Sequence, residues 1–275
     1  MSKIFSSRFA LPVIIFLLSF IIIKCKDNNH NTGNLSGTDA SNNAPPILNH
    51  TIVKVYPHDT SSYTQGLTFY NNELYEGTGL AGRSKLMKVN LETGEIIKQI
   101  KLSDDFFGEG IAILRDTIYQ LTWQQNVVFI YTLKDFKKVK EYHLDGEGWG
   151  ITTDGQKLIV SNGSGDLYFY DPSTFRLLSK TSIMEGNSPT YNLNELEYFD
   201  GYVYANQYTY PYILKIDAEA GKVVAKYDIS DMLKRVQTEK TDVDYLNGIA
   251  YNDSTKKIYV TGKLWPEMYE IVLGQ

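Results

Sequence analysis

A pattern that recurs about every 45 residues constrains the fold of this chain more than any other feature of its sequence. Each of five copies contains a polar residue, an anchor that is glycine in four copies, an apolar strand start, a turn and a second strand. The anchors are Gly66, Gly110, Gly150, Glu195 and Gly248, with successive spacings of 44, 40, 45 and 53 residues. Periods of roughly 40–45 residues are typical of β-propeller blades.

Further strand-like segments follow in each copy, so four strands per repeat are predicted. The pairs Asp154–Gly155 and Asp200–Gly201 favour tight hairpins between the first two strands. The fifth copy lacks its outer strand, and the segment "HTIVKVYPHD" at residues 50–59 can supply it. We therefore predict an all-β, five-bladed β-propeller whose N-terminal strand closes the last blade. Two β-sandwiches are the alternative, but they would not explain the regular spacing.

The N-terminus has the composition of a targeting segment. A basic start with Lys3 and Arg8 precedes an apolar stretch over residues 10–23, which is shorter than the roughly 20 residues of a membrane span. Cys25, the only cysteine of the chain, follows directly and is the expected lipidation site of a bacterial lipoprotein. Lys24 departs from the usual small residue before such a cysteine, so an uncleaved anchor or plain secretion remain alternatives.

We predict three parts: residues 1–25 as signal peptide or lipoprotein-type N-terminus, residues 26–46 as a flexible polar tether, and residues 47–275 as the catalytic propeller. The expected location is the bacterial cell envelope, periplasmic or membrane-anchored and facing away from the cytoplasm. The formal charge is −5 and the basic residues are scattered, which argues against nucleic acid as a partner. We expect a monomer.

Aligning the five copies groups candidate site residues into two rings at one mouth of the channel. The residues just before the anchors are Gln65, Glu109, Trp149, Asn194 and Asn247. The residues five positions after the start of the second strand are Gly79, Trp123, Gly163, Tyr208 and Lys263. Convergence of one carboxylate, one ammonium, carboxamides and aromatic rings is typical of a ligand pocket.

Each of these residues also has a purely structural interpretation. The asparagines could cap turns, and the tryptophans could belong to the core. Lys263 could be a solvated charge paired with Glu267, and Glu109 could accept backbone N–H bonds from its own loop. Gly108 and Gly110 beside Glu109 predict clearance that lets a substrate backbone approach the carboxylate.

Several stretches resemble one family closely. They are "YTQGLTFYNNELYEGTGLAGRSKLMKVNLETGEI", "FFGEGIAILRDTIYQLTW", "LNELEYFDGYVYAN" and "DVDYLNGIAYNDSTKKIYVTGKLWPEMYEI". The chain is similar to the plant and bacterial type of glutaminyl-peptide cyclotransferase over residues 50–275. The resemblance implies a five-bladed propeller that converts the N-terminal glutamine of peptides into pyroglutamate and releases ammonia.

The resemblance also implies roles for individual residues. Glu109, in "FGEG", corresponds to the family's proposed acid/base. The implied pocket residues are Gln65, Phe107, Trp123, Trp149, Asn194 and Lys263. Tyr208, in "YANQY", stands where the family usually has a second tryptophan wall, which puts pocket width and substrate preference in doubt.

This reaction requires neither a metal nor another cofactor, and we predict none. The histidines (His30, His50, His58 and His143) show no ligand spacing, although a Ca²⁺ in the channel remains open. The expected partners are peptides or proteins with N-terminal glutamine, and a membrane reached through the N-terminal lipid or anchor. Two other functions stay open: a non-catalytic envelope lipoprotein that binds peptides, and a metal-dependent propeller lactonase, for which one glutamate in the ring is too few ligands.

Overall fold

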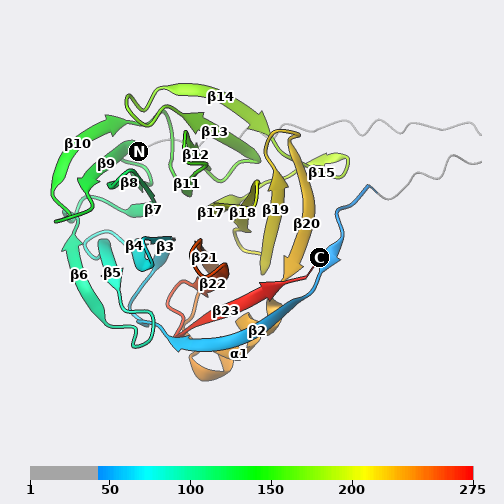
Figure 1. The fold of residues 1–275 in the computed structure, drawn as a ribbon. Coiled ribbons are helices and arrows are strands. Elements are labelled where there is room, and N and C mark those ends of the chain that lie inside the picture. Colours follow the sequence, from blue (N-terminus) through cyan, green and yellow to red (C-terminus); the bar gives the residue numbers. More distant parts are fainter. Residues whose placement is uncertain (1–42, 275) are drawn as a thin grey trace, which may run out of the picture. The chain divides into compact units, whose positions relative to one another are not determined.

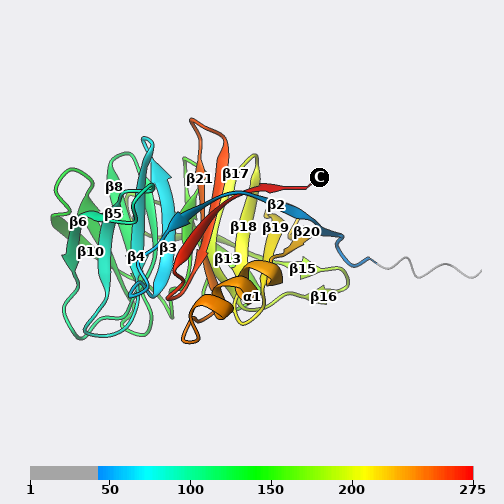
Figure 2. The same cartoon turned by 90° about the horizontal axis from the view of Figure 1, so that it is seen from below.

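The computed structural model describes residues 43–274, and its regular structure is almost entirely β-strand. The sheets follow one another around a central axis (Figure 1), and the strands run along the height of the ring when it is seen from the side (Figure 2). The prediction of an all-β propeller is confirmed. Residues 1–25 with Cys25, and the predicted tether up to residue 42, lie outside the described residues.

Four of the sheets have four antiparallel strands each. One comprises β3 (Thr64–Tyr70), β4 (Glu73–Thr78), β5 (Lys85–Val89) and β6 (Ile96–Lys101). The next comprises β7 (Gly108–Leu114), β8 (Thr117–Thr122), β9 (Val127–Thr132) and β10 (Lys138–His143). Another comprises β11 (Ile151–Thr153), β12 (Leu158–Val160), β13 (Asp166–Tyr170) and β14 (Leu177–Ser182). The last comprises β21 (Leu246–Asn252), β22 (Lys257–Gly262), β23 (Glu267–Leu273) and β2 (His50–Pro57).

The remaining sheet has seven strands. Its antiparallel body comprises β17 (Leu193–Phe199), β18 (Tyr202–Gln207), β19 (Tyr212–Asp217) and β20 (Lys222–Asp228). Three short strands add to its outer edge: β1 (Ile47–Leu48), β15 (Met184–Glu185) and β16 (Ser188–Pro189). The repeat does not predict these additions, because they occur in one copy only.

The N-terminal strand closes the ring as predicted. β2 runs antiparallel to β23, with His50 opposite Leu273 and Pro57 opposite Glu267. The pairing covers the edge that β23 would otherwise expose. It also ties the two ends of the propeller sequence into one sheet (Figure 1).

The tight turns between first and second strands use left-handed backbone. Asp200 and Gly201 both have positive φ, 50° and 83°, as a type I′ turn requires. Arg115 and Asp116 adopt the same conformation, with φ of 50° and 58°. The sequence gives no turn signal for the second pair, so the register of the sheet and not turn propensity determines this turn.

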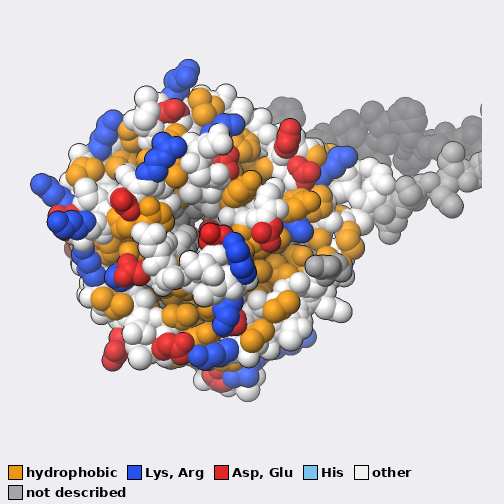
Figure 3. Space-filling model, in the orientation of Figure 1, with side chains coloured by type: hydrophobic (Ala, Val, Ile, Leu, Met, Phe, Trp, Pro, Cys, Tyr) orange, Lys and Arg blue, Asp and Glu red, His pale blue; other side chains and the backbone are white. Residues whose placement is uncertain are grey.

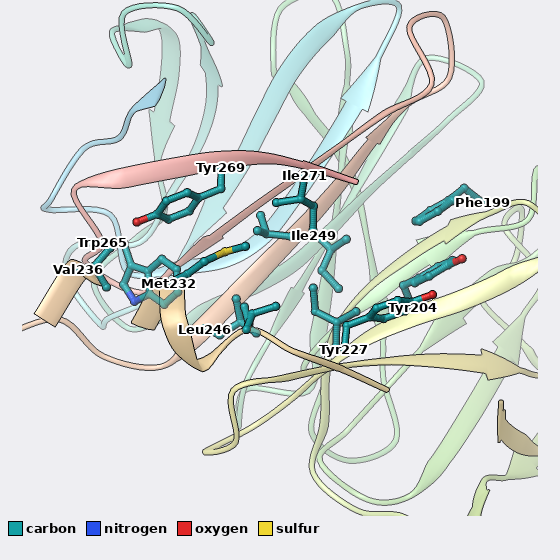
Figure 4. Close-up of a cluster of buried hydrophobic side chains, with 13 residues drawn as sticks. Phe199, Tyr204, Tyr227, Met232, Val236, Leu246, Ile249, Trp265, Tyr269 and Ile271 are labelled. Atoms are coloured by element: carbon teal, nitrogen blue, oxygen red, sulfur yellow. The ribbon is translucent and has the colours of Figure 1, made fainter. Parts of the chain in front are cut away.

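One helix, α1 (Ser230–Glu239), occupies the longest spacing between anchors. It buries Met232 and Val236 in the cluster that contains Trp265 (Figure 4). The chain leaves α1 toward Asp244, whose backbone oxygen accepts a hydrogen bond from the Trp265 indole at 2.9 Å. Within residues 43–274, no helix is long and apolar enough to cross a membrane. On the face shown in Figure 3, acidic and basic side chains are interspersed around the ring.

The glycine anchors allow the innermost strands to touch. A Cβ at Gly66 would lie 2.4 Å from the backbone nitrogen of Ile111, and one at Gly150 would lie 2.0 Å from the backbone oxygen of Asn194. These distances are far below any van der Waals contact, so only glycine fits. Glycine therefore recurs at the anchors Gly66, Gly110 and Gly150 because neighbouring first strands contact each other there.

Candidate active site

A cavity of about 290 Å³ opens at one mouth of the channel. Its lining residues are Tyr63, Gln65, Phe107, Glu109, Trp123, Trp149, Asn194, Tyr208 and Lys263. The structure thus brings together all eight residues that the sequence singled out for the site, and adds Tyr63.

Two structural positions supply most of the lining, as the repeat predicts. Gln65, Glu109 and Asn194 lie near the starts of the first strands β3, β7 and β17. Trp123 and Lys263 follow directly after the second strands β8 and β22. The two sets meet because first and second strands are antiparallel, so the start of one lies beside the end of the other.

Glu109 is buried at 4% exposure. Burial raises the pKa of its carboxyl well above the usual range. The charge of Lys263 opposes this shift, the charge of Glu147 adds to it, and a hydrogen bond with Gln65 opposes it. The carboxyl is therefore a strong base for a glutamate, in a cavity where proton transfer can be used.

The amide of Gln65 is oriented by Asn247. The Asn247 Nδ2 group donates to the backbone oxygen of Thr64 and to Oε1 of Gln65, both at 2.9 Å. Since its oxygen is taken, Gln65 presents its amide nitrogen to Glu109. Asn247 itself is fully buried behind Gln65, so the expectation that all five residues of its ring line the mouth is wrong at this position.

Lys263 is buried at 3% exposure, and burial lowers the pKa of its ammonium. The Nζ atom lies 4.9 Å from the ring centroid of Tyr63 and 4.8 Å from that of Tyr208. Glu267 is paired with Arg235 at 2.7 Å. The alternative of a solvated lysine paired with Glu267 is therefore wrong, and the cation is held between two aromatic rings.

Aromatic rings contact each other edge to face along the cavity wall. The ring centroids of Phe107 and Trp123 are 5.6 Å apart, and those of Trp149 and Tyr208 are 5.5 Å apart. Tyr245, outside the lining set, contacts Tyr208 at 5.2 Å. Trp123 is 37% exposed, so this tryptophan is a wall of the mouth and not a core residue.

Two glycines in the second ring make room for these walls. A Cβ at Gly79 would lie 2.4 Å from the Phe107 ring, and one at Gly163 would lie 2.6 Å from the Trp149 ring. The ring positions that lack a side chain are thus covered by an aromatic residue from the start of a first strand. Phe107 and Trp149 thereby occupy the two places of the ring where glycine has no side chain.

The glycines beside Glu109 lie against the backbone of neighbouring blades. A Cβ at Gly108 would lie 2.8 Å from the backbone oxygen of Thr78, and one at Gly110 would lie 2.7 Å from that of Trp149. Both glycines make room for the adjacent blades, which is a reason for glycine that the sequence did not reveal.

Asn194 presents an unsatisfied acceptor. Its side chain is 2% exposed, and its Oδ1 atom has no hydrogen-bond partner among residues 43–274. A buried acceptor without a partner costs roughly 1–3 kcal/mol unless a ligand satisfies it. The turn-capping alternative for Asn194 is not supported, because Asn194 lies within β17 and its Oδ1 accepts no hydrogen bond from the described residues.

Tyr63 and Glu147 are the site residues that the sequence did not reveal. Tyr63 lies three positions before its anchor Gly66, and the same position of other copies holds Phe107, Glu147 and Tyr245, so this shared position is a signal that could have found both residues. Glu147 lies in a second Gly–Glu–Gly triplet, at residues 146–148, but three positions before its anchor Gly150 and not one. The recurrence of the triplet could have drawn attention to it. Within the described part of the chain, no group of three or more His, Cys, Asp or Glu side chains is placed to hold a metal ion.

Comparison with known proteins agrees with this geometry. The profile of a family described as glutamine cyclotransferase matches residues 25–273. A glutaminyl-peptide cyclotransferase from Arabidopsis thaliana is 34% identical over an alignment of 273 residues, which covers 98% of this chain and 84% of that protein. The crystal structure of Myxococcus xanthus glutaminyl cyclase has a TM-score of 0.78 and 32% identity, covering 83% of this chain and 98% of that one. The similarity therefore extends over most of the chain and is not confined to one motif.

Proposed function

This chain belongs to the glutamine cyclotransferase family, and we propose that it converts the N-terminal glutamine of peptides into pyroglutamate with Glu109 as the proton carrier. Glutaminyl-peptide cyclisation is the activity that the family and both relatives support. One observation carries the role of Glu109: among the described residues that line the cavity, it is the single carboxylate.

The reaction closes a five-membered ring within the substrate. The α-nitrogen attacks the side-chain amide carbon, an N–C bond forms, and the carbonyl electron pair moves to oxygen while Glu109 takes a proton from the attacking nitrogen. The C=O bond then re-forms, the bond to the amide nitrogen breaks, and Glu109 returns the proton so that ammonia leaves. One carboxyl serves both steps because both nitrogens are bonded to the same carbon.

Two neighbours of Glu109 fit the other requirements of this chemistry. Lys263 carries the positive charge of the cavity, so we assign it to the developing oxyanion. Asn194 has the free Oδ1 acceptor, so we assign it to an N–H group of the substrate. Gln65 already donates toward Glu109, which assigns it to orienting the base and not to binding the oxyanion. The aromatic walls hold the folded glutamine side chain close to its own amine.

Mass spectrometry of a glutamine-initiated peptide tests this function. Incubation with the protein is expected to remove the mass of one ammonia, and Glu109→Gln is expected to slow that loss by about 10²- to 10⁴-fold. A matched peptide that begins with asparagine, whose cyclisation would give a strained four-membered ring, is the substrate control. A wild-type protein that leaves the glutamine peptide intact would refute the function. Peptide binding without turnover would favour the non-catalytic alternative.

We also propose that the ring has five blades. The seven-stranded sheet counts as one blade in this proposal, because β17 to β20 repeat the strand order of the four-stranded sheets. The small strands at its outer edge are then additions to the blade. An experimental structure in which β17 to β20 do not form a separate blade would refute the count of five.

For the N-terminus, we propose a lipoprotein anchored through Cys25, with the propeller on the outer side of a bacterial membrane. The support is the order of basic, apolar and cysteine residues in the sequence. Labelling with a radioactive fatty acid tests the proposal, with Cys25→Ser as the control. Equal labelling of both proteins would contradict it.

A further inference from the structure

Glu147 binds both tryptophans of the cavity wall. Its Oε2 atom accepts the indole N–H of Trp123 at 2.9 Å and the indole N–H of Trp149 at 3.0 Å. Its Oε1 atom lies 3.5 Å from Nε2 of Gln124. A single carboxylate oxygen therefore joins two walls that are supplied by different blades.

The remaining contacts of the two indoles are apolar and do not determine their orientation by themselves. Trp123 meets Phe107 edge to face, and Trp149 meets Tyr208 edge to face. Ring contacts of this kind allow a range of angles. A charge-assisted hydrogen bond at the indole nitrogen is directional and stronger than a neutral one, so it selects one angle for each ring.

The carboxylate of Glu147 also acts on the base. Its negative charge adds to the raised pKa of Glu109, against the charge of Lys263 and the hydrogen bond with Gln65. Tyr63 and Tyr208 are the other titratable groups that face Glu109 from the lining. Glu147 thus has two separable properties, an acceptor oxygen and a charge.

We propose that Glu147 is a positioning residue that fixes the gap between Trp123 and Trp149, and so sets how tightly the glutamine side chain of the substrate is held. This inference rests on the proposed function, since it concerns the same cavity. It assigns to Glu147 no contact with the reacting atoms. The two indoles act as one wall only while the shared oxygen is present.

Two substitutions separate the two properties. Glu147→Gln keeps one oxygen that can accept both indole N–H groups but removes the charge. Glu147→Ala removes both. Asp145→Ala is the matched control, because it removes an exposed carboxylate from the same loop, where Asp145 forms an ion pair with His143 at 3.2 Å.

Indole N–H signals in a ¹H–¹⁵N NMR spectrum report the hydrogen bonds of Trp123 and Trp149 to Glu147 and require no turnover. The chain has three tryptophans, and the third, Trp265, donates to the backbone oxygen of Asp244 and not to Glu147. In Glu147→Ala, the signals of Trp123 and Trp149 are expected to shift while that of Trp265 stays. In Glu147→Gln, the signals of Trp123 and Trp149 are expected to shift less than in Glu147→Ala, because both hydrogen bonds can remain but become neutral. In Asp145→Ala, all three are expected to stay near their wild-type positions.

Kinetics then test the consequence for catalysis. Glu147→Ala is expected to raise KM by about 10- to 100-fold with a smaller change in kcat, because misplaced walls weaken substrate positioning. Glu147→Gln is expected to keep KM within about threefold and to move the acidic limb of the pH profile to lower pH, since a charge that raises the Glu109 pKa is gone. Unmoved indole signals in Glu147→Ala would overturn the proposal, as would a Glu147→Gln protein that matches Glu147→Ala in KM. An inactive wild type would instead refute the proposed function, and the NMR result would still stand.

Discussion

Two buried glutamates of this propeller have the same burial and different surroundings. Glu109 and Glu195 both lie on first strands, and both have carboxyl pKa values raised mainly by burial. Glu195 accepts the backbone N–H groups of Leu67 at 3.2 Å and Ile249 at 2.8 Å. Glu109 faces the cavity, and its carboxyl forms a hydrogen bond with the side chain of Gln65.

The difference shows that a perturbed pKa does not by itself identify a catalytic group. Glu195 is the one anchor that is not glycine. Its two oxygens accept backbone N–H groups from two other first strands, so it acts as a structural strap that joins three first strands across the channel. Glu109 keeps its carboxyl available to a ligand. The hydrogen-bond partners of a buried carboxyl, more than its burial, separate the two roles.

The largest effect expected from this comparison is on turnover. Glu109→Gln keeps the size of the side chain but cannot accept and return a proton. We expect kcat to fall by about 10²- to 10⁴-fold, the usual contribution of general acid–base catalysis. Unfolding in urea should be nearly unchanged. Steady-state kinetics with a glutamine peptide checks the first expectation, and a kcat within threefold of wild type would remove Glu109 from the mechanism.

Glu195→Ala should show the opposite pattern. The substitution leaves the backbone N–H groups of Leu67 and Ile249 without an acceptor, which lowers the free energy of unfolding by about 1–3 kcal/mol for each group. We expect a lower free energy of unfolding in urea, with kcat per folded molecule within about threefold of wild type. Glu141→Ala on the outer strand β10 is the control for loss of a carboxylate. A stable Glu195→Ala protein would end the assignment of Glu195 as a strap.

Much of this fold could be predicted from sequence because the repeat is regular. The anchors fixed the position of each first strand, and antiparallel pairing then brought Glu109, Trp123 and Lys263 to one mouth. What the repeat could not predict are features that occur once, such as the helix α1 and the extra strands beside β20. The partners of Glu147 and Asn247 were also out of reach, because hydrogen bonds between blades depend on side-chain distances that a one-dimensional pattern does not contain.

A third buried glutamate, Glu197 on β17, makes the stability of the fold depend on pH. Burial raises the pKa of Glu197 to about 8, although Tyr251 N–H and Thr152 donate to it. A carboxyl whose folded pKa is raised stabilises the fold fully below its unfolded pKa and loses that contribution as pH rises through the folded value. Stability should therefore fall between about pH 4.5 and pH 8. Urea unfolding across this range should show a shallower fall in Glu197→Gln, and parallel curves would contradict the shift.

The smallest expected effect concerns Tyr208, where the family usually has tryptophan. Its ring contacts Lys263 Nζ at 4.8 Å, Trp149 at 5.5 Å and Tyr245 at 5.2 Å between centroids. Tyr208→Phe keeps the ring and these contacts, so KM and kcat should stay within about twofold. Tyr208→Trp keeps a cation–π partner for Lys263 but narrows the cavity on the side of Tyr245. We expect KM to change by about two- to tenfold, with kcat within about threefold, because the base and the oxyanion donor are untouched. Kinetics with several glutamine peptides measures both constants. A loss of kcat as large as that in Glu109→Gln would mean that this wall takes part in the chemistry, and the distinction between binding walls and the proton carrier would then fail.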